Sequence, residues 1–412
     1  MFKYLKNTKS LLTGLICLAY IGLFLPIGVS NITLIALLVF CLLKTKPWEI
    51  LMAIKENSFS KLFLALYFVQ MIGLFYTTNL HNGFFILEKK LSLLLIPLIV
   101  LPLLQKVNTD TKLILKWIGI ITVASSLVLL VIATIKRLIL NDPQAFFYED
   151  FTSIHYVYYS IYFACGALLL IDALFDTWVE KKFGVLSITM LFVYSLAILI
   201  LVASKTGIGA FCVASIFLLY KKIPNKKIFA LSLLFLITTA FVLLYFNATT
   251  RNRFIEMDQN LSFLLLDDFR GVEVYITDLT MRLLFWKISI VHLWQDHLIM
   301  TGVGTGDAQD YINSLYILPQ YELYGYVNWD SHNQWVFTFI QMGLMGILVM
   351  AILYGKYFIE GFRINDLKLI CFLIITGGFS LTESILESNK GIVFFALLFT
   401  LFCSAHKKTI TE

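Results

Sequence analysis

Long apolar runs separated by short polar segments repeat along most of the chain. A spanning helix needs about 20 apolar residues, and lipid offers no partners to backbone groups, so helices are the default spanning element. The pattern therefore predicts about twelve membrane-spanning helices, several of them short for a bilayer. The runs are residues 10–28, 31–44, 61–77, 91–104, 113–135, 154–173, 184–202, 206–220, 228–246, 334–354, 367–381 and 391–405.

The composition strengthens this interpretation and excludes other classes of protein. Of the 412 residues, 59% are hydrophobic and 14% are charged, whereas soluble domains carry about 25% charged residues. Soluble, disordered and disulfide-stapled classes are therefore excluded. We predict an all-α polytopic membrane helix bundle, with residues 1–412 forming a single membrane domain. The six cysteines all lie inside apolar runs without a CxxC pair, so they are interpreted as apolar fillers and not as metal ligands.

The distribution of Lys and Arg predicts the orientation. If the N-terminus is cytoplasmic, the inner segments hold 21 of the 32 basic residues and the outer segments hold 11. Because inner loops are enriched in Lys and Arg, we expect both termini to be cytoplasmic. The first run follows a basic tail but has no small-x-small cleavage site, so a retained helix is expected. Since the basic residues are spread between apolar runs, they do not indicate nucleic-acid binding.

The segment from 248 to 331 is the main departure from a plain bundle, and the predicted orientation places it on the outer face. Connections this long are usually functional or disordered. The stretch 279–298 is amphipathic and contains Trp286 and Trp294 among polar residues. Helices of this kind lie at membrane interfaces. We therefore expect a large outer loop with amphipathic helices whose apolar side chains press against the bilayer.

Several cations lie on the predicted outer side, against the orientation trend. Lys205 follows Ser204 in a tight turn, Lys89 and Lys90 open the fourth span, and Arg282 lies in a helix beginning near Thr277 or Asp278. Each has an ordinary interpretation, as a lysine reaching for water, an interfacial helix end or a headgroup contact. Each is also a candidate ligand for an anion, because polar groups at a membrane boundary are often functional.

The segment Asp330-Ser331-His332-Asn333 stands at the start of the tenth span. Asp330 or Ser331 is expected to cap that helix, which places His332 in the first turn. A histidine there is often structural, but a neutral imidazole can also act as a base near pH 7. Glu383 and Glu387 lie four residues apart and are expected to share a helix face and to pair with outer cations.

Glycines at 302, 304 and 306 resemble a phosphate loop, yet no strand precedes them. A turn that returns the outer loop over the membrane is the favoured interpretation, and a nucleotide site is not expected outside the cell. The sequence contains no HExxH, DxD or GxSxG motif and no run of carboxylates typical of a metal cage. Neither a metal nor a cofactor is predicted.

Together these motifs resemble the O-antigen ligase and O-antigen polymerase superfamily of bacterial envelope enzymes. Members have about twelve spans and a large late periplasmic loop. The family's Ser-Arg pair is matched by Ser204-Lys205, its Arg before a Trp by Arg282 and Trp286, and its G-x-G by Gly302 and Gly304. Its His-Asn is matched by His332-Asn333, and its later G-x-x-G by Gly343 and Gly346. Residues 87–99 and 381–395 resemble ligase-like members from Bacteroidetes. Lys205 replaces an Arg, which keeps the charge but loses bidentate geometry.

The resemblance implies a membrane glycosyltransferase of the bacterial inner membrane that works without a cofactor. It implies transfer of a glycan from undecaprenyl pyrophosphate to an acceptor, such as lipid A–core, at the periplasmic face. The hypothesis is that His332 acts as the base and that Asp330 and Asn333 support it. Lys205, Arg282, Lys90 and Lys89 are the candidate pyrophosphate contacts.

The shared donor chemistry leaves several alternatives open. A polymerase or a protein O-oligosaccharyltransferase would use the same motifs, and the ligase is favoured by residues 87–99 and 381–395. A transporter of lipid-linked sugars is the alternative from a different class. Transporters often show related halves and broken helices at the midplane. No similarity between the halves is seen in the sequence, and the candidate charges gather at one face.

Overall fold

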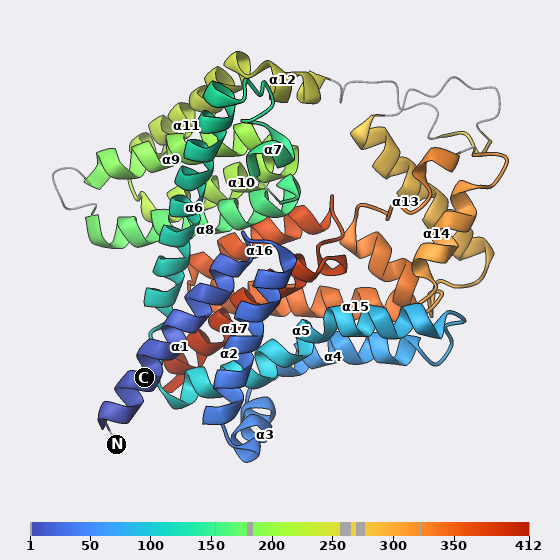
Figure 1. The fold of residues 1–412 in the computed structure, drawn as a ribbon, viewed down its shortest axis with the longest axis horizontal. Coiled ribbons are helices and arrows are strands. Elements are labelled where there is room, and N and C mark those ends of the chain that lie inside the picture. The colour runs from blue at the N-terminus through green and yellow to red at the C-terminus, as the bar shows by residue number, and fades with distance from the viewer. Residues whose placement is uncertain are drawn as a thin grey trace.

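The computed structural model of the chain is a helical bundle (Figure 1). It describes residues 2–152, 154–178, 184–255, 265–268, 277–321 and 323–411. Within those ranges the chain forms α-helices and short 3-10 turns, and no strand. The predicted all-α polytopic class is therefore confirmed.

Every predicted run coincides with a helix, and most helices extend beyond the predicted limits. These helices are α1 (Phe2–Gly22), α2 (Ile27–Lys44), α4 (Ser58–Gly73), α5 (Leu80–Lys106), α6 (Thr111–Ile139), α8 (Tyr156–Trp178), α9 (Gly184–Val202), α10 (Lys205–Lys222), α11 (Lys226–Phe246), α15 (Gln334–Arg363), α16 (Leu367–Ser380) and α17 (Asn389–Thr411). The remaining helices are α3 (Pro47–Glu56), α7 (Tyr148–Thr152), α12 (Ala248–Ile255), α13 (Asp278–Gln295) and α14 (Ala308–Tyr316).

By length and composition, six of the described helices are able to cross a membrane, namely α2, α6, α8, α9, α11 and α15. Burial separates the centre of the bundle from its rim. The most apolar window of α8 is 78% buried, whereas that of α11 is 6% buried. Along α17 the side chains from Ile392 to Phe402 are buried on all sides. A helix that is apolar all round belongs inside a bundle, so α8 and α17 form its centre.

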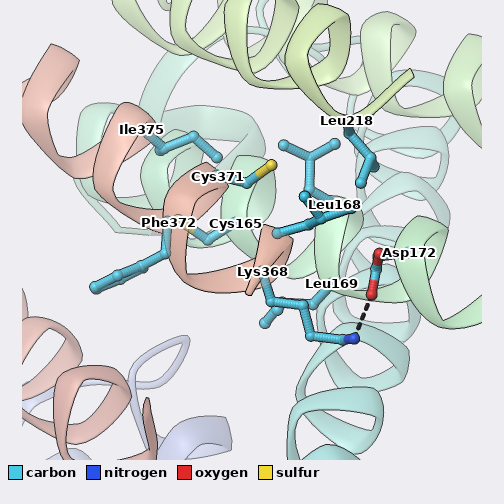
Figure 2. Close-up of a pocket in the computed structure, with 10 residues that line it drawn as sticks. Cys165, Leu168, Leu169, Asp172, Leu218, Lys368, Cys371, Phe372 and Ile375 are labelled. Atoms are coloured by element: carbon cyan, nitrogen blue, oxygen red, sulfur yellow. Dashed lines mark ion pairs between the residues drawn. The ribbon is translucent and has the colours of Figure 1, made fainter. Parts of the chain in front are cut away.

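The two termini lie close together in Figure 1, at the end of the bundle near α3. A small cavity of about 10 Å³ lies among α8, α10 and α16, and it is lined mainly by apolar side chains. Lys368 forms an ion pair with the buried Asp172 beside it (Figure 2), and Lys222 contacts the same carboxylate at 2.9 Å. A cavity of this size holds at most about one water. We therefore interpret these ion pairs as structural contacts that hold α8, α10 and α16 together.

Helix α15 is broken inside its apolar run, at Gly343, where φ is 59° and ψ is −151°. The break frees two carbonyl groups, and the glycine-rich turn binds them. Val303 N donates to Ile340 O at 2.8 Å, and Gly304 N donates to Gln341 O at 3.0 Å. The outer loop therefore turns back toward the bundle at the glycine-rich segment, as predicted, and this segment packs against the break in α15.

Helices α13 and α14 form a cap beside the starts of α5 and α15 (Figure 1). Their apolar faces build a second core that contains Leu284, Phe285 and Tyr316 together with Ile340 of α15. The expectation that the apolar side chains of residues 279–298 press against the bilayer is therefore wrong for Leu284 and Phe285, because α14 and α15 cover that face. Asp307 anchors the cap to the bundle by accepting from the backbone N–H groups of residues 78 and 79 at 2.6 and 2.7 Å.

Replacing Gly343 by Ala is expected to destabilise the fold by about 1–3 kcal/mol, since a positive φ strains a side-chain-bearing residue. A Cβ at this position would also lie 2.5 Å from the backbone of Met300. Thermal unfolding in detergent measures the change. Gly355→Ala, on the same helix with open space around its Cβ, is the control and should be neutral or slightly stabilising. Equal stability of the two variants would contradict the need for glycine at the break.

Candidate functional site

A cavity of about 680 Å³ lies where the cap meets the bundle. Six parts of the chain contribute to its wall: the start of α5, the start of α8, α13, the start of α14, the residues that precede and begin α15, and the turn between α16 and α17. Its charged and aromatic lining includes Lys89, His155, Tyr156, Asp278, Arg282, Trp329, Asp330, His332, Glu383 and Glu387. The structure thus brings together several predicted site residues that are far apart in the sequence, among them Lys89, Arg282 and His332.

Glu383 and Glu387 do not share a helix face as predicted. Helix α16 ends at Ser380, and the chain turns through a 3-10 helix at Ile385–Glu387 before α17 begins. Their pairing with cations is confirmed, because Glu383 contacts Arg282 and Glu387 contacts Lys90. The two carboxylates therefore occupy a turn between two apolar helices, where each is free to point at a different partner.

Glu383 links the cap to the segment before α15. Its Oε1 accepts from Arg282 Nη2 at 2.9 Å, and its Oε2 lies 3.3 Å from His332 Nδ1. Both carboxylate oxygens are thus engaged, one by a fixed cation and one by an imidazole. This arrangement fixes the direction of the ring and leaves its other nitrogen, Nε2, without a hydrogen-bond partner among the described residues.

His332 lies outside helix α15, not in its first turn as predicted. Asn333 is the N-cap, and its Oδ1 accepts from Trp335 N and Val336 N. His332 has a φ of +46°, and Asp330 Oδ1 accepts from its backbone N–H at 2.7 Å. Nearby, Trp286 Nε1 donates to Ser331 O at 2.8 Å. A residue other than glycine at this φ is strained, and such strain clusters at functional sites.

The environment of His332 favours the charged imidazole. Burial opposes protonation, but the hydrogen bond to Glu383 and the charges of Asp330 and Glu383 outweigh it, so the pKa of His332 is raised. Burial raises the pKa of Asp330 as well. The Nε2 atom of His332 is buried and has no hydrogen-bond partner among the described residues. Since buried polar atoms are normally satisfied, a substrate hydroxyl is a suitable missing partner.

The adjacent lysines of α5 have different surroundings. Lys90 is buried, with 2% of its side chain exposed, and it contacts Glu387 Oε1 at 2.5 Å and Gln341 Oε1 at 3.1 Å. Lys89 lines the cavity, and it has no carboxylate partner within the part of the chain that the structure describes. Neighbouring residues on a helix point about 100° apart. Of these two lysines, Lys89 therefore lines the cavity, whereas Lys90 is held in its wall by Glu387.

Lys205 begins α10, after Ser204, whose Oγ accepts from Gly207 N at 3.1 Å. The lysine does not line the cavity, but its Nζ lies 3.6 Å from the carboxylate of Asp278, which does. Asn333, predicted as a supporting residue, donates to Leu381 O at 3.0 Å and so ties α15 to the end of α16. Lys205 and Asn333 therefore border the site that Arg282, His332 and Lys89 line.

Sequence reasoning did not identify His155, Tyr156 and Trp329, which also line the cavity. One signal was present, because the His-Tyr pair stands at the start of an apolar run on the same predicted side as His332. Trp329 lay within the long loop, three residues before His332, and had no periodic pattern to mark it.

Comparison with known proteins supports the resemblance drawn from the motifs. Residues 190–351 match the family model described as O-antigen ligase, which confirms the predicted superfamily. The matched range contains Lys205, Arg282 and His332, and it ends before Glu383 and Glu387. A comparison with curated proteins gives no significant match. The chain is therefore a membrane protein with a segment, residues 190–351, that is similar to the O-antigen ligase family.

Replacing Lys90 by Met is expected to destabilise the protein by about 3–5 kcal/mol, because it leaves the Glu387 carboxylate buried without its partner. The double variant Lys90→Met/Glu387→Met removes both charges and should recover much of that loss. Lys89→Met is the control and should change stability little. Thermal unfolding in detergent compares the three. A double variant less stable than Lys90→Met would contradict the buried ion pair.

Proposed function

We propose that this protein transfers a glycan from undecaprenyl pyrophosphate to lipid A–core at the periplasmic face of the bacterial inner membrane. One observation carries the proposal. His332 is held by Glu383, its Nε2 has no partner among the described residues, and the cavity also presents Arg282 and Lys89. An imidazole and fixed cations in one cavity suit a reaction in which a hydroxyl loses a proton and a pyrophosphate leaves.

The proposed step begins when Nε2 of His332 takes the proton from an acceptor hydroxyl. The hydroxyl oxygen attacks the anomeric carbon of the donor glycan, and the bond between that carbon and the pyrophosphate oxygen breaks. The electron pair leaves with the pyrophosphate, which remains attached to the polyprenyl chain. Attack from the opposite side inverts the anomeric configuration. The proton on His332 then passes to solvent.

Arg282 and Lys89 are the proposed contacts of the departing pyrophosphate. Arg282 uses Nη2 for Glu383, while its buried Nε has no hydrogen-bond partner among the described residues. A guanidinium carries five donors, so one carboxylate does not saturate it. Lys205 lies behind Asp278 and contributes charge to the same side. Lys90 keeps Glu387 neutralised, and its proposed role is to support the wall.

The donor's lipid tail places the reaction beside the membrane. The proposed topology, with cytoplasmic termini and an outer loop from 248 to 331, puts the cavity on the periplasmic side. This placement is supported by the position of the site at the starts of α5, α8 and α15 and after α16. In the predicted topology all of these ends lie outside, so every wall of the cavity comes from the same face of the bundle.

The ligase is preferred over a polymerase or a protein O-oligosaccharyltransferase. Residues 87–99 and 381–395, which resemble ligase-like members, supply Lys89, Glu383 and Glu387 to the cavity wall. A transporter would need the break in α15 to line a substrate path. Instead, backbone N–H groups of the cap loop bind the carbonyls freed at the break, so this feature does not favour transport.

Replacing His332 by Ala is expected to reduce glycan transfer by about 10²–10⁴-fold, the contribution of a positioned general base. Transfer from a purified lipid-linked glycan to lipid A–core in proteoliposomes measures the effect. His81→Ala is the matched control, because His81 is exposed on α5 and does not line the cavity. Full activity in a well-folded His332→Ala protein would overturn the assignment of the base.

The pH dependence tests the link between His332 and Glu383. A base must be neutral, so the rate falls as the pH drops through the pKa of His332. That pKa is raised above its ordinary value of 6.5, chiefly through Glu383 and against the effect of burial. Glu383→Gln removes this support, so the acidic limb of the pH–rate profile should move to lower pH.

The control for this profile is Glu88→Gln, which removes the same charge from an exposed residue of α5 that does not line the cavity. Its acidic limb should coincide with that of the unsubstituted protein. If Glu383→Gln also leaves the limb in place, the titrating group is not His332 in contact with Glu383.

A further inference from the structure

Trp329 is an exposed aromatic residue on a rigid backbone. Its side chain is 45% exposed, yet its N–H donates to Tyr326 O at 3.0 Å and its carbonyl accepts from Gln309 Nε2 at 3.1 Å. The preceding Asn328 has a φ of +74°, and its N–H donates to Asn313 Oδ1 at 2.8 Å. The fold thus fixes the position of a large apolar surface without burying it.

The ring of Trp329 is supported from behind. Its centroid lies 5.6 Å from that of Tyr326, and Tyr326 lies 5.6 Å from Phe285 in the core of the cap. Such edge contacts stabilise aromatic pairs and fix their orientation. The ring lines the 680 Å³ cavity. An exposed aromatic face held in this way, at the wall of a polar cavity, indicates a surface built to receive a ligand.

The surroundings of Trp329 define the chemistry of that ligand. Asn328 and Gln309 line the same wall, and within the described residues the Asn328 Nδ2 and the Gln309 Oε1 make no hydrogen bond. An apolar face bordered by an amide donor and an amide acceptor suits a sugar ring, which has a C–H face and a hydroxyl rim. The cavity's cations, Arg282 and Lys89, come from other elements, so the charged part of the donor has a separate place.

The short distance between Trp329 and His332 indicates whether the donor glycan or the acceptor sugar stacks on Trp329. The rings of Trp329 and His332 lie 5.6 Å apart at 67°, so a sugar stacked on Trp329 lies beside the imidazole. We propose that Trp329 binds the acceptor sugar and presents its hydroxyl to His332, with Asn328 and Gln309 holding neighbouring hydroxyls. This assignment rests on the proposed function, because it names the acceptor's place in that same site.

The test separates binding from turnover. Calorimetry measures the binding of delipidated core oligosaccharide in a His332→Ala background, which reduces transfer. Three proteins are compared: one that keeps Trp329, one with Trp329→Phe and one with Trp329→Ala. Loss of the aromatic surface should weaken binding about tenfold in Trp329→Ala, whereas Trp329→Phe keeps most of the affinity. The matched control is Trp294→Ala, since Trp294 is exposed on α13 and does not line the cavity.

In the active protein, Trp329→Ala should raise the KM for lipid A–core about tenfold and leave the KM for the lipid-linked donor unchanged. Unchanged binding of core oligosaccharide, or a rise in the donor KM alone, would overturn the acceptor assignment. Failure of the proposed function gives a different result: the unsubstituted protein then transfers no glycan, whatever residue 329 is. Binding of core oligosaccharide that depends on Trp329 in that case still supports a sugar site.

Discussion

Cationic side chains at the end of an apolar helix bundle need partners of opposite charge. In this protein two carboxylates in one turn are those partners. Glu383 and Glu387 lie between α16 and α17 and hold Arg282, His332 and Lys90 within hydrogen-bond reach. Taking a charge out of water without a partner costs several kcal/mol. The helices that carry these groups are therefore brought to the same end of the bundle, and the cavity is the space that remains between them.

The same polar connections reach the broken helix. Gln341, beside the break in α15, accepts from Lys90 at 3.1 Å and from Gln70 at 3.3 Å through its Oε1, while its backbone carbonyl accepts from Gly304. The ion pair of Lys90, the break at Gly343 and the docking of the cap thus share residues. A site that depends on the cap is held in place by the bundle's own buried hydrogen bonds, which keeps Arg282 and His332 in a fixed relation.

The sequence predicted the helices well because lipid imposes one simple rule, a long apolar run, and the start of α13 at Thr277 carried a capping signal. The exact ends of the helices, where several neighbouring residues are able to serve as the cap, were harder to predict. Asn333 took the N-cap in place of Asp330 or Ser331, which moved His332 out of the helix, and the end of α16 at Ser380 separated the two glutamates. Which of Lys89 and Lys90 lines the cavity depends on the rotation of α5 and on the ion pair of Lys90 with Glu387. Glu387 lies 297 residues away from Lys90 in the sequence, so the order of residues along the chain does not predict this pair.

The central claim is that this cavity cleaves the bond between a glycan and a polyprenyl pyrophosphate. The most direct measurement uses the purified protein in proteoliposomes with a lipid-linked glycan and lipid A–core, and follows both lipids by mass spectrometry. We predict equal amounts of free undecaprenyl pyrophosphate and glycan-bearing lipid A–core. Relocation of the donor across the bilayer with its glycan still attached would contradict the claim and indicate a transporter.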